Sequence, residues 1–582
     1  MLGSPLLAGA LLVAVCVVTG CRVNTDDLRR WEKTQNGPDK LVAVLIHDKY
    51  EKELRVEAAW SLVDMKRRGG QPVGLNRLIE ELQKMSASER REILEGLWKK
   101  LGPKVVVPLE KAGDGKVADP AVSFKDATFA LFNEEKLEMD GKLRTSMASA
   151  LAEWALGKEG DAPDKRLENF EKKMDNSGQA YGLEQILRKL GTSASTRLPA
   201  LLKAAPAVKS VKLDAIARIT VDVKPTGGDK KAAEAYDKAR DELSANFAEL
   251  LKATLGDGYT KGVEDEVKAT LGGNPQGKTV LADPKLFATY MNKVRDDRLN
   301  YMFPIAKLAG RKAVVDVLVA LASDGKAQKE HRALALAALE GNVDTTSDDS
   351  LKAFLAIAKS DAPDEVKHGA LLRISNYPPE KAIKTFYELF DAPNWKVRFD
   401  GAMSVLALMQ KAGTKSGTTV KEFLGKLPRG LGGPEAPPIP GKETGGNKMG
   451  LGEPSSYGQA FTLLPKDMGV DAAIADILTG NPTDRKPIGP LLTAFGYYYA
   501  TGKPSDLPML AKWETDKQPV PKCKEDDECN WEKPGCPVPK NPAKPDDGYD
   551  NKSIATVGDY VTYCVKPEIE RRAKLPAAPE TK

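Results

Sequence analysis

The sequence feature that most constrains the fold is a helical hairpin that recurs three times between about residues 305 and 410. In each copy, two segments with apolar residues at helical spacing are separated by a short break rich in Asp, Pro or Gly. The paired segments are Ala313–Ala322 with His331–Leu339, Leu351–Ala358 with Val366–Ile374, and Ala382–Phe390 with Val397–Val405. A repeat at a spacing of roughly 30–35 residues is typical of a solenoid, in which each unit buries its apolar face against its neighbours. The sequence therefore predicts an all-α solenoid over this range.

Similar apolar segments occur upstream, so we expect the solenoid to cover residues 40–410, with its most regular part at 305–410. The upstream segments are Lys40–Ile46, Leu54–Leu62, Val122–Leu131, Leu183–Leu202 and Leu213–Ile219. A more polar stretch follows, with long helices such as Lys230–Leu255. An irregular all-α fold is the alternative for the residues before 300.

The second helix of these hairpins resembles the second helix of HEAT and armadillo-type repeats. Val366-Lys367 and Val397-Arg398 stand where those families carry Val-Arg, and small residues such as Gly401 follow them. Small residues suit this position because stacked helices approach each other closely. The resemblance implies an α-solenoid of HEAT-like hairpins that presents a surface to another protein.

The charge balance and the scarcity of histidine restrict the possible functions. Among 582 residues, 87 are basic and 82 acidic, and no Lys/Arg block stands out. We therefore expect neither nucleic acid as a partner nor a phosphate-tracking surface. The only histidines are His47, His331 and His368, which leaves little scope for histidine catalysis or a histidine metal site. His331 and His368 are interpreted as packing or surface residues, and Asp316 as a solvent-facing residue at the edge of its helix.

The N-terminus carries an uncharged apolar segment, Leu6–Gly20, that ends in Val18-Thr-Gly-Cys21. The segment is shorter than the about 20 residues that a membrane-spanning helix needs, and it is typical of a secretory signal. Its end resembles the lipobox of bacterial lipoproteins, although the preceding residues Met1–Pro5 contain no Lys or Arg. A plain signal anchor, or a cleaved signal with an incidental cysteine, is the alternative.

The lipobox resemblance implies an address as well as a modification. Residues 1–20 would be the signal peptide and 21–39 a tether, with a diacylglycerol on the Cys21 thiol. Several acyl chains hold a protein stably on a membrane. Arg22 stands in place of the Asp that retains such proteins in the inner membrane, so the resemblance favours the outer membrane facing the periplasm.

Gly272-Gly-Asn-Pro-Gln-Gly-Lys278-Thr279 matches the nucleotide-binding P-loop pattern letter for letter. A P-loop follows a buried strand, whereas the residues before Gly272 predict a charged helix. They belong to a small duplication, Leu251–Gly256 and Val267–Gly272, in which each helix stops at a glycine that tolerates the left-handed conformation. We therefore expect no nucleotide and no other cofactor.

The remaining chain divides into a linker and a cysteine-containing end. Glycine and proline dominate residues 411–457, which predicts a long loop or linker. Residues 458–582 resume the helical pattern at Val470–Thr479 and Pro487–Thr501, with a last helix expected near Ser553. This region contains Cys523, Cys529, Cys536 and Cys564, and their even number and exported context favour two disulfides. A zinc site is the alternative, but the Cys-x-x-Cys pairs typical of such sites are lacking.

These observations predict a non-catalytic lipoprotein of the bacterial cell envelope, whose helical repeats form a scaffold for an envelope protein partner. Two other functions stay open. One is an envelope enzyme or enzyme accessory with its site in residues 458–582. The other is a chaperone-like carrier of envelope proteins. The identity of the partner and the face that binds it do not follow from the sequence.

Overall fold

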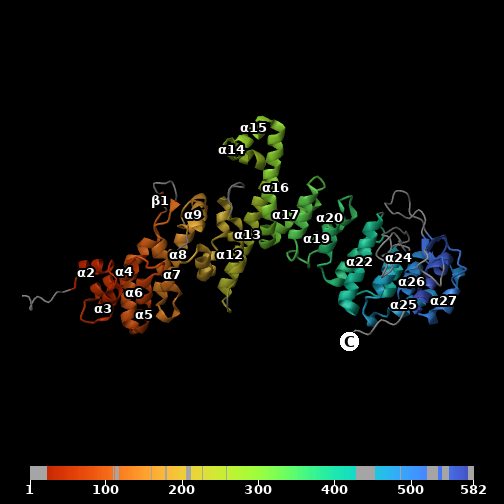
Figure 1. Cartoon of the computed structure of the whole chain (residues 1–582), viewed down its shortest axis with the longest axis horizontal. Coiled ribbons are helices and arrows are strands. Elements are labelled where there is room, and N and C mark those ends of the chain that lie inside the picture. The colour runs from red at the N-terminus through yellow and green to blue at the C-terminus, as the bar shows by residue number, and fades with distance from the viewer. Residues whose placement is uncertain are drawn as a thin grey trace, which may run out of the picture. The chain divides into compact units, whose positions relative to one another are not determined.

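The computed structural model describes residues 23–108, 110–111, 117–158, 160–176, 180–204, 212–225, 227–256, 258–392, 394–427, 453–484, 487–520, 535–540 and 549–574. Nearly all of the secondary structure in these residues is helical (Figure 1). Contacts divide the chain into two compact units, unit 1 up to Val314 and unit 2 from Val315. The boundary lies inside the range that the repeat pattern assigns to one solenoid.

The helices of unit 1 are short to medium in length, apart from two long ones near its end. They are α2 (Thr25–Trp31), α3 (Gly37–Ile46), α4 (Lys52–Asp64), α5 (Val73–Lys84), α6 (Ala87–Val105), α7 (Val122–Asn133), α8 (Gly141–Leu156), α9 (Pro163–Asn176), α10 (Leu183–Leu190), α11 (Thr192–Ser195), α12 (Leu213–Asp222), α13 (Lys230–Leu255), α14 (Gly258–Gly272), α15 (Pro275–Ala282) and α16 (Pro284–Leu308). A two-stranded antiparallel ribbon, β1 (Glu110–Lys111) with β2 (Val117–Ala118), interrupts them.

Unit 2 begins within a helix and ends with a second small ribbon. Its helices are α17 (Lys312–Ser323), α18 (Lys329–Ala338), α19 (Asp349–Lys359), α20 (Asp364–Ile374), α21 (Pro379–Tyr387), α22 (Trp395–Ala412), α23 (Val420–Lys426), α24 (Glu453–Phe461), α25 (Val470–Leu478), α26 (Ile488–Thr501), α27 (Leu507–Ala511), α28 (Val557–Tyr560) and α29 (Lys566–Ala573). The ribbon pairs β3 (Gly535–Pro539) with β4 (Tyr549–Ser553) in antiparallel register.

In both units, a helix packs on its hairpin partner and also on the helix two places further along the chain. The runs α4–α6–α8–α10–α12 in unit 1 and α18–α20–α22–α24–α26 in unit 2 follow this rule. Helices two places apart meet when successive hairpins stack side by side, as in a helical-repeat array. The predicted all-α, repeat-type fold is therefore supported by the packing within each unit.

Recurring arginines join the two helices of several hairpins. Arg55 donates from Nε to the Leu45 carbonyl at 2.8 Å, Arg166 to the Leu156 carbonyl at 3.1 Å, and Arg332 to the Ala322 carbonyl at 2.9 Å. Each arginine lies near the start of a second helix, and each acceptor lies near the end of the first, where carbonyls lack helical partners. A cation also interacts favourably with a helix C-terminus. The same bond therefore closes three hairpins.

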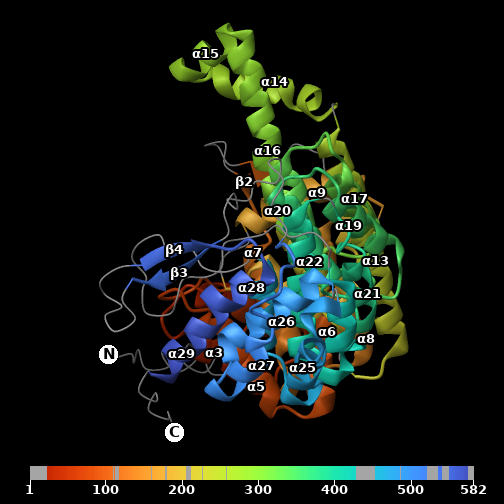
Figure 2. The same cartoon turned by 90° about the vertical axis from the view of Figure 1, so that its right-hand side faces the viewer.

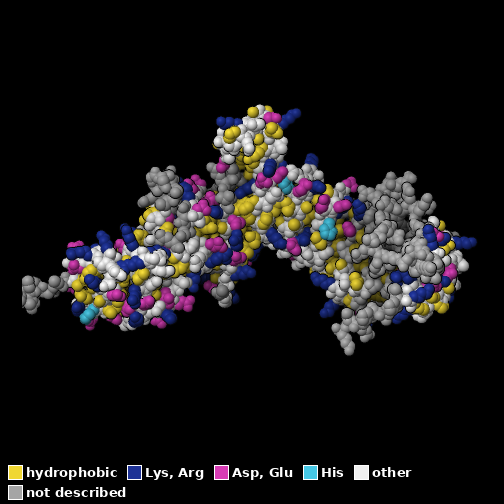
Figure 3. All heavy atoms as spheres, viewed as in Figure 1, with side chains coloured by type: hydrophobic (Ala, Val, Ile, Leu, Met, Phe, Trp, Pro, Cys, Tyr) yellow, Lys and Arg dark blue, Asp and Glu magenta, His cyan; other side chains and the backbone are white. Residues whose placement is uncertain are grey.

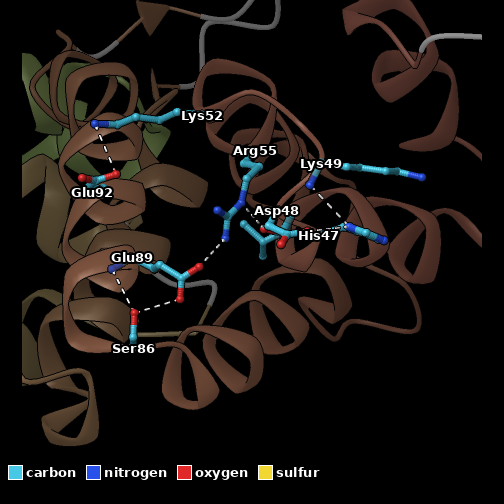
Figure 4. Close-up of polar contacts among 9 residues, drawn as sticks. His47, Asp48, Lys49, Lys52, Arg55, Ser86, Glu89 and Glu92 are labelled. Carbon is cyan, nitrogen blue, oxygen red and sulfur yellow. Dashed lines mark hydrogen bonds and ion pairs between the residues drawn. The ribbon is translucent and has the colours of Figure 1, made fainter.

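The first of these arginines also connects its hairpin to the next one (Figure 4). Arg55 Nη2 lies 3.4 Å from Glu89 Oε1 on α6, and Lys52 forms an ion pair with Glu92 at 3.6 Å. Ser86 caps α6 and donates to Glu89 Oε2 at 2.8 Å. That hydroxyl, together with Arg55, lowers the pKa of Glu89. Polar contacts thus accompany the apolar packing of α4 on α6.

Most of the predicted helices are confirmed to within a few residues. The six segments of the three hairpins correspond to α17 through α22, and the predicted helix Lys230–Leu255 has the bounds of α13. The range Leu183–Leu202 holds α10, which ends before Gly191 as expected, but Pro199–Ala204 forms a 3₁₀ helix. Gly191 has a left-handed φ of 70°. In contrast, Gly256 has a φ of −75°, so the left-handed conformation expected there is wrong.

The C-terminal region differs from the prediction in two places. Helix α23 lies within the range predicted as a linker, because Val420, Phe423 and Leu424 form an apolar face that is buried. Ser553 ends strand β4 instead of starting a helix, and the final helical segment begins with α28 at Val557, after Thr556 caps it. Nothing in the apolar periodicity of the proline-rich β3 segment signals a strand.

Close approach of α24 and α26 forms the core of the C-terminal part. A Cβ atom on Gly458 would lie 2.4 Å from the Tyr497 amide nitrogen and 2.8 Å from the Thr493 carbonyl oxygen. Only glycine allows the two backbones to approach so closely. Among the described residues, no helix is both long enough and apolar enough to cross a membrane.

Helices α14, α15 and the first half of α16 project from the rest of unit 1 (Figures 1 and 2). A small apolar cluster of Tyr259, Val263 and Met291 holds this arm together. The P-loop pattern lies in it, at the turn between α14 and α15. Asn274 caps α15 by accepting from the Gly277 amide at 2.5 Å, and Gly277 packs against the Leu271 carbonyl. The predicted helical context is confirmed, since a helix precedes the pattern where a P-loop has a strand.

Candidate interaction surface

The most regular part of unit 2 presents apolar side chains to solvent on neighbouring helices. Helix α18 packs on α20, and α20 packs on α22; we call these three helices the ridge. Leu334 on α18 is 37% exposed and Leu372 on α20 is 45% exposed. Gly369 lets α20 approach α18, because a Cβ there would lie 3.0 Å from the Leu336 side chain. The ridge therefore combines closely approaching backbones with an exposed leucine on each of α18 and α20.

Charged groups accompany these leucines. His368 on α20 is exposed, and Asp400 on α22 is partly buried. Burial raises the pKa of the Asp400 carboxyl, and the nearby His368 opposes this shift. Lys396 pairs with Asp364 at 3.5 Å on the same helices. The ridge thus combines apolar contact area with a histidine and an aspartate that interact electrostatically.

The interior of unit 1 contains an unusual set of charges, four of them buried and Arg67 partly exposed, which we call the buried charge cluster: Arg67, Asp119, Lys125, Asp126 and Lys173. Asp126 accepts from Arg67 Nη2 at 2.7 Å and pairs with Lys125 Nζ at 2.7 Å. The amides of Ala180 and Tyr181 also donate to this carboxylate, and Lys125 donates to the Tyr181 carbonyl. Buried charges are costly unless they are paired, so these bonds fix α7 against the following segments.

Two ammonium groups of the cluster lie over one tryptophan. The Trp154 ring centre is 5.4 Å from Lys125 Nζ and 4.9 Å from Lys173 Nζ. Asp119 accepts from Trp154 Nε1 at 2.8 Å. Lys173 is only 2% exposed, and its burial lowers the pKa of its amine to about 8, with Asp119 opposing the shift. The cluster connects several segments in the interior of unit 1. Lys173 is its member with the weakest electrostatic compensation for burial, since Asp119 alone opposes the lowering of its pKa.

The structure describes only some of the cysteines that the sequence predicts to be modified or paired. Cys21, Cys523 and Cys529 lie outside the described residues. Cys536 is described only as part of strand β3, whereas Cys564 is buried within the π-helix Val561–Val565. The lipidation of Cys21 and the pairing of the four C-terminal cysteines therefore stay predictions.

The histidines and the interrupting aspartate are placed by the structure. Asp316 is exposed, as predicted, and His331 is buried while His368 faces solvent. In the part of the chain that the structure describes, no group of three or more His, Cys, Asp or Glu side chains could hold a metal ion. Basic and acidic side chains are interspersed on the face of each unit that Figure 3 shows.

The buried charge cluster was missed in the sequence, although a signal was present. Lys125 stands three residues after Val122 and four before Phe129, on the apolar stripe of helix α7. A charge on an apolar stripe at helical spacing indicates a buried ionic contact. Its partners Arg67, Asp119 and Lys173 come from distant positions, and no local pattern connects them.

Comparisons with known proteins found matches among solved structures alone. No protein-family model matches the sequence, and no curated protein matches it. Among solved structures, importin beta is 11% identical, with coverage of 91% of this chain and 69% of that one and a TM-score of 0.21. She4p is 10% identical, with 88% and 81% covered and a TM-score of 0.16, and an engineered protein is 17% identical, with 79% and 98% covered and a TM-score of 0.18.

Importin beta and She4p are helical-repeat proteins. Their TM-scores are too low to establish a shared arrangement of helices with this chain. The assignment of an all-α repeat fold therefore rests on the packing within each unit and on the recurring arginine bonds.

Proposed function

We propose that this protein is a non-catalytic lipoprotein of the bacterial cell envelope and that its ridge binds an envelope protein partner. The observation that carries the proposal is the exposure of Leu334 and Leu372 on neighbouring, closely packed helices. Single exposed leucines are common on protein surfaces. We propose that these two, on helices that pack on each other, belong to an apolar contact area that a partner protein buries together with a polar rim.

The charged residues of the ridge suit such a rim. His368 lies one helical turn before Leu372 on α20, and Asp400 on α22 is near enough to His368 for the two to interact electrostatically. Electrostatic complementarity of this kind sets the specificity and the rate of association. A protein partner uses both kinds of contact, whereas a small ligand requires a concave site.

The proposed cellular location rests on the sequence around Cys21. The apolar segment Leu6–Gly20 and the lipobox-like Val18–Cys21 support export and lipid attachment. Arg22 supports the outer membrane, with the protein facing the periplasm. The repeat array would then be held at a membrane surface by a short tether.

Site-specific photo-crosslinking in intact cells tests the ridge. A photo-reactive amino acid replaces Leu372, and in a matched control it replaces Leu463, which is 62% exposed in the same unit but lies outside the ridge. We expect one covalent protein adduct from position 372 and none from position 463. The double variant L334D/L372D should lose the partner in a purified complex, while L463D should retain it. Equal adducts from both positions would refute the ridge as the binding surface.

The same experiment separates the two other functions. A chaperone-like carrier would give many different adducts at position 372 instead of one. An envelope enzyme with its site in residues 458–582 would keep its activity in L334D/L372D and would form no adduct at the ridge. Both results contradict the scaffold function.

A further inference from the structure

The start of α2 lies close to the proposed site of lipid attachment. Helix α2 begins at Thr25, within the range predicted as a tether, and Asn24 caps it by accepting from the Asp26 amide at 2.9 Å. Three residue steps connect Asn24 to Cys21. Because an extended chain advances by at most about 3.6 Å per residue, their Cα atoms are no more than about 11 Å apart. With acyl chains on Cys21, the start of α2 therefore lies at a membrane surface.

Helices α2 and α4 run side by side in the same direction. Arg29 of α2 forms ion pairs with Glu57 at 3.7 Å and with Asp64 at 3.5 Å, both on α4. Beyond the ends of the two helices, Arg68 donates to the Gln35 carbonyl at 2.6 Å. The ends of α2 and α4 thus lie together, so the start of α2 faces the end of the hairpin at which α4 begins. The turn that joins α3 to α4 lies at this same end.

That turn, Ile46–Tyr50, presents apolar and aromatic surface, and we call it the first turn. Ile46, the last residue of α3, is 50% exposed, and Tyr50 is partly exposed. Lys49 Nζ lies 4.8 Å from the centre of the Tyr50 ring. Figure 4 shows the side chains of His47 and Lys49 pointing away from Arg55, which joins this hairpin to the next one. The first turn therefore offers its side chains to the surroundings and not to the neighbouring hairpin.

The side chains of the first turn suit the interface between lipid and water. Tyrosine is enriched there, because its ring is apolar and its hydroxyl is polar. A lysine beside it keeps its ammonium in water while its methylenes lie along apolar surface. Ile46 adds an apolar group that a bilayer can bury. Apart from Ile46, the large apolar side chain that is exposed in the described part of unit 1 is Leu286, which lies on α16 in the arm.

Charge does not drive a contact of the first turn with lipid. Around the turn, the exposed residues Lys49 and Lys52 oppose the exposed residues Asp48, Glu51 and Glu53. This balance gives no excess of positive charge for anionic headgroups. The apolar and aromatic groups would therefore supply the contact, and its strength should not depend on anionic lipid.

We propose that the first turn lies on the membrane surface, with Ile46 inserted at the boundary between headgroups and acyl chains. This orientation depends on the lipid attachment of the proposed function, because one isoleucine and one tyrosine do not hold a protein on a bilayer by themselves. The acyl chains on Cys21 provide the attachment, and the first turn fixes how the first hairpin faces the bilayer. None of these residues belongs to the ridge.

Fluorescence quenching by brominated lipid tests the contact. An environment-sensitive fluorescent amino acid replaces Ala43, which is exposed on α3 one helical turn before Ile46. The full lipidated chain is reconstituted into phosphatidylcholine vesicles, and in a matched control the probe replaces Leu286, which is 49% exposed. We expect brominated lipid to reduce the emission at position 43 and to leave that at position 286 unchanged. Addition of phosphatidylglycerol should leave the quenching at position 43 as it is.

A pair of matched substitutions identifies the group that makes the contact. With the probe at position 43, Ile46→Asp should lose the quenching, because a carboxylate avoids the bilayer, while Leu286→Asp should keep it. Both variants should float with the vesicles and melt like the wild type, because both side chains are exposed.

The outcomes separate this orientation from the lipid attachment on which it depends. A wild-type chain that does not float with vesicles would overturn both. A chain that floats but shows no quenching at position 43, equal quenching at positions 43 and 286, or unchanged quenching in Ile46→Asp would overturn the orientation alone. Quenching that appears only with phosphatidylglycerol would also overturn it, since the contact would then depend on charge.

Discussion

At the scale of single residues, the buried charge cluster shows how a polar interior is balanced. Three cations meet two carboxylates there, and Arg67 and Lys125 share Asp126. Lys173 has the Trp154 ring beside it, and Asp119 interacts with it only at longer range. Its ammonium therefore retains much of the cost of leaving water, which lowers its pKa to about 8. This cost makes the stability of the protein depend on pH in a defined direction.

Lys173→Met should stabilise the protein at pH 7, by up to about 3 kcal/mol, because methionine keeps the packing and carries no charge to bury. Below pH 8 the wild-type lysine is charged in both the folded and the unfolded state, so the cost is present in full. Between pH 8 and about 10 the unfolded state binds more protons, so wild-type stability should rise with pH relative to the variant. Urea denaturation at pH 7 and pH 9.5 measures both effects.

The control for this experiment is Lys172→Met, at the neighbouring position on α9. Lys172 forms an exposed ion pair with Glu168 of the same helix, and such pairs contribute little. The Lys172→Met variant should have the same free energy of unfolding as the wild type, with the same dependence on pH. If the free energy of unfolding changed with pH in the same way in the wild type and in Lys173→Met, the proposed cost of burying the Lys173 ammonium would be contradicted.

At the scale of elements, one arginine bond recurs in hairpins that differ in sequence. Arg55, Arg166 and Arg332 each donate to a carbonyl near the end of the preceding helix. The bond satisfies a carbonyl that has no helical partner and fixes the angle at which the chain turns back. Repeated closure of this kind lets hairpins with different core residues stack in the same way.

Arg55→Met should lower the free energy of unfolding by about 2 kcal/mol, the typical value for a hydrogen bond to a charged group. The matched control is Arg91→Met in the same unit, because Arg91 is exposed and pairs, within the described chain, with exposed Glu95 and partly exposed Asp140. The control should change stability by less than about 0.5 kcal/mol. Urea denaturation followed by circular dichroism distinguishes the two, and equal losses would mean that the carbonyl bond adds nothing beyond the ion pair with Glu89.

At the scale of the whole molecule, the proposed membrane attachment depends on one side chain. The described helices contain no span that could cross a membrane. In the proposed function, the acyl chains on Cys21 supply the attachment, since each buried methylene contributes about 0.8 kcal/mol.

Cys21→Ala should move the protein from the membrane fraction to the aqueous phase in detergent phase separation. The wild type should incorporate radiolabelled palmitate, and the variant should not. A control at another cysteine of the leader, Cys16→Ala, should behave as the wild type. A Cys21→Ala protein that stays wholly with membranes would refute lipid attachment at this residue.

The sequence by itself determined the helices and their pairing. Apolar spacing predicted α17 through α22 and the bounds of α13. A helix that packs on a neighbour needs apolar residues at helical spacing on one face, and this periodicity can be read from consecutive residues. It also placed Lys278 in a helical setting that argues against a P-loop. The ridge residues Leu334 and Leu372 lie within predicted helices. Their exposure could not be predicted, because the sequence pattern does not distinguish an apolar residue on a helix surface from one in the core.

Tertiary structure alone decided which residues meet. It brought Arg67 beside Asp126 and Lys173 near Asp119 in unit 1, and it packed α18, α20 and α22 into the ridge. It also added the β3–β4 ribbon, in which proline-rich Gly535–Pro539 pairs with Tyr549–Ser553. Burial and pairing depend on contacts between positions far apart in the chain, so periodicity, which is a property of neighbours, does not encode them.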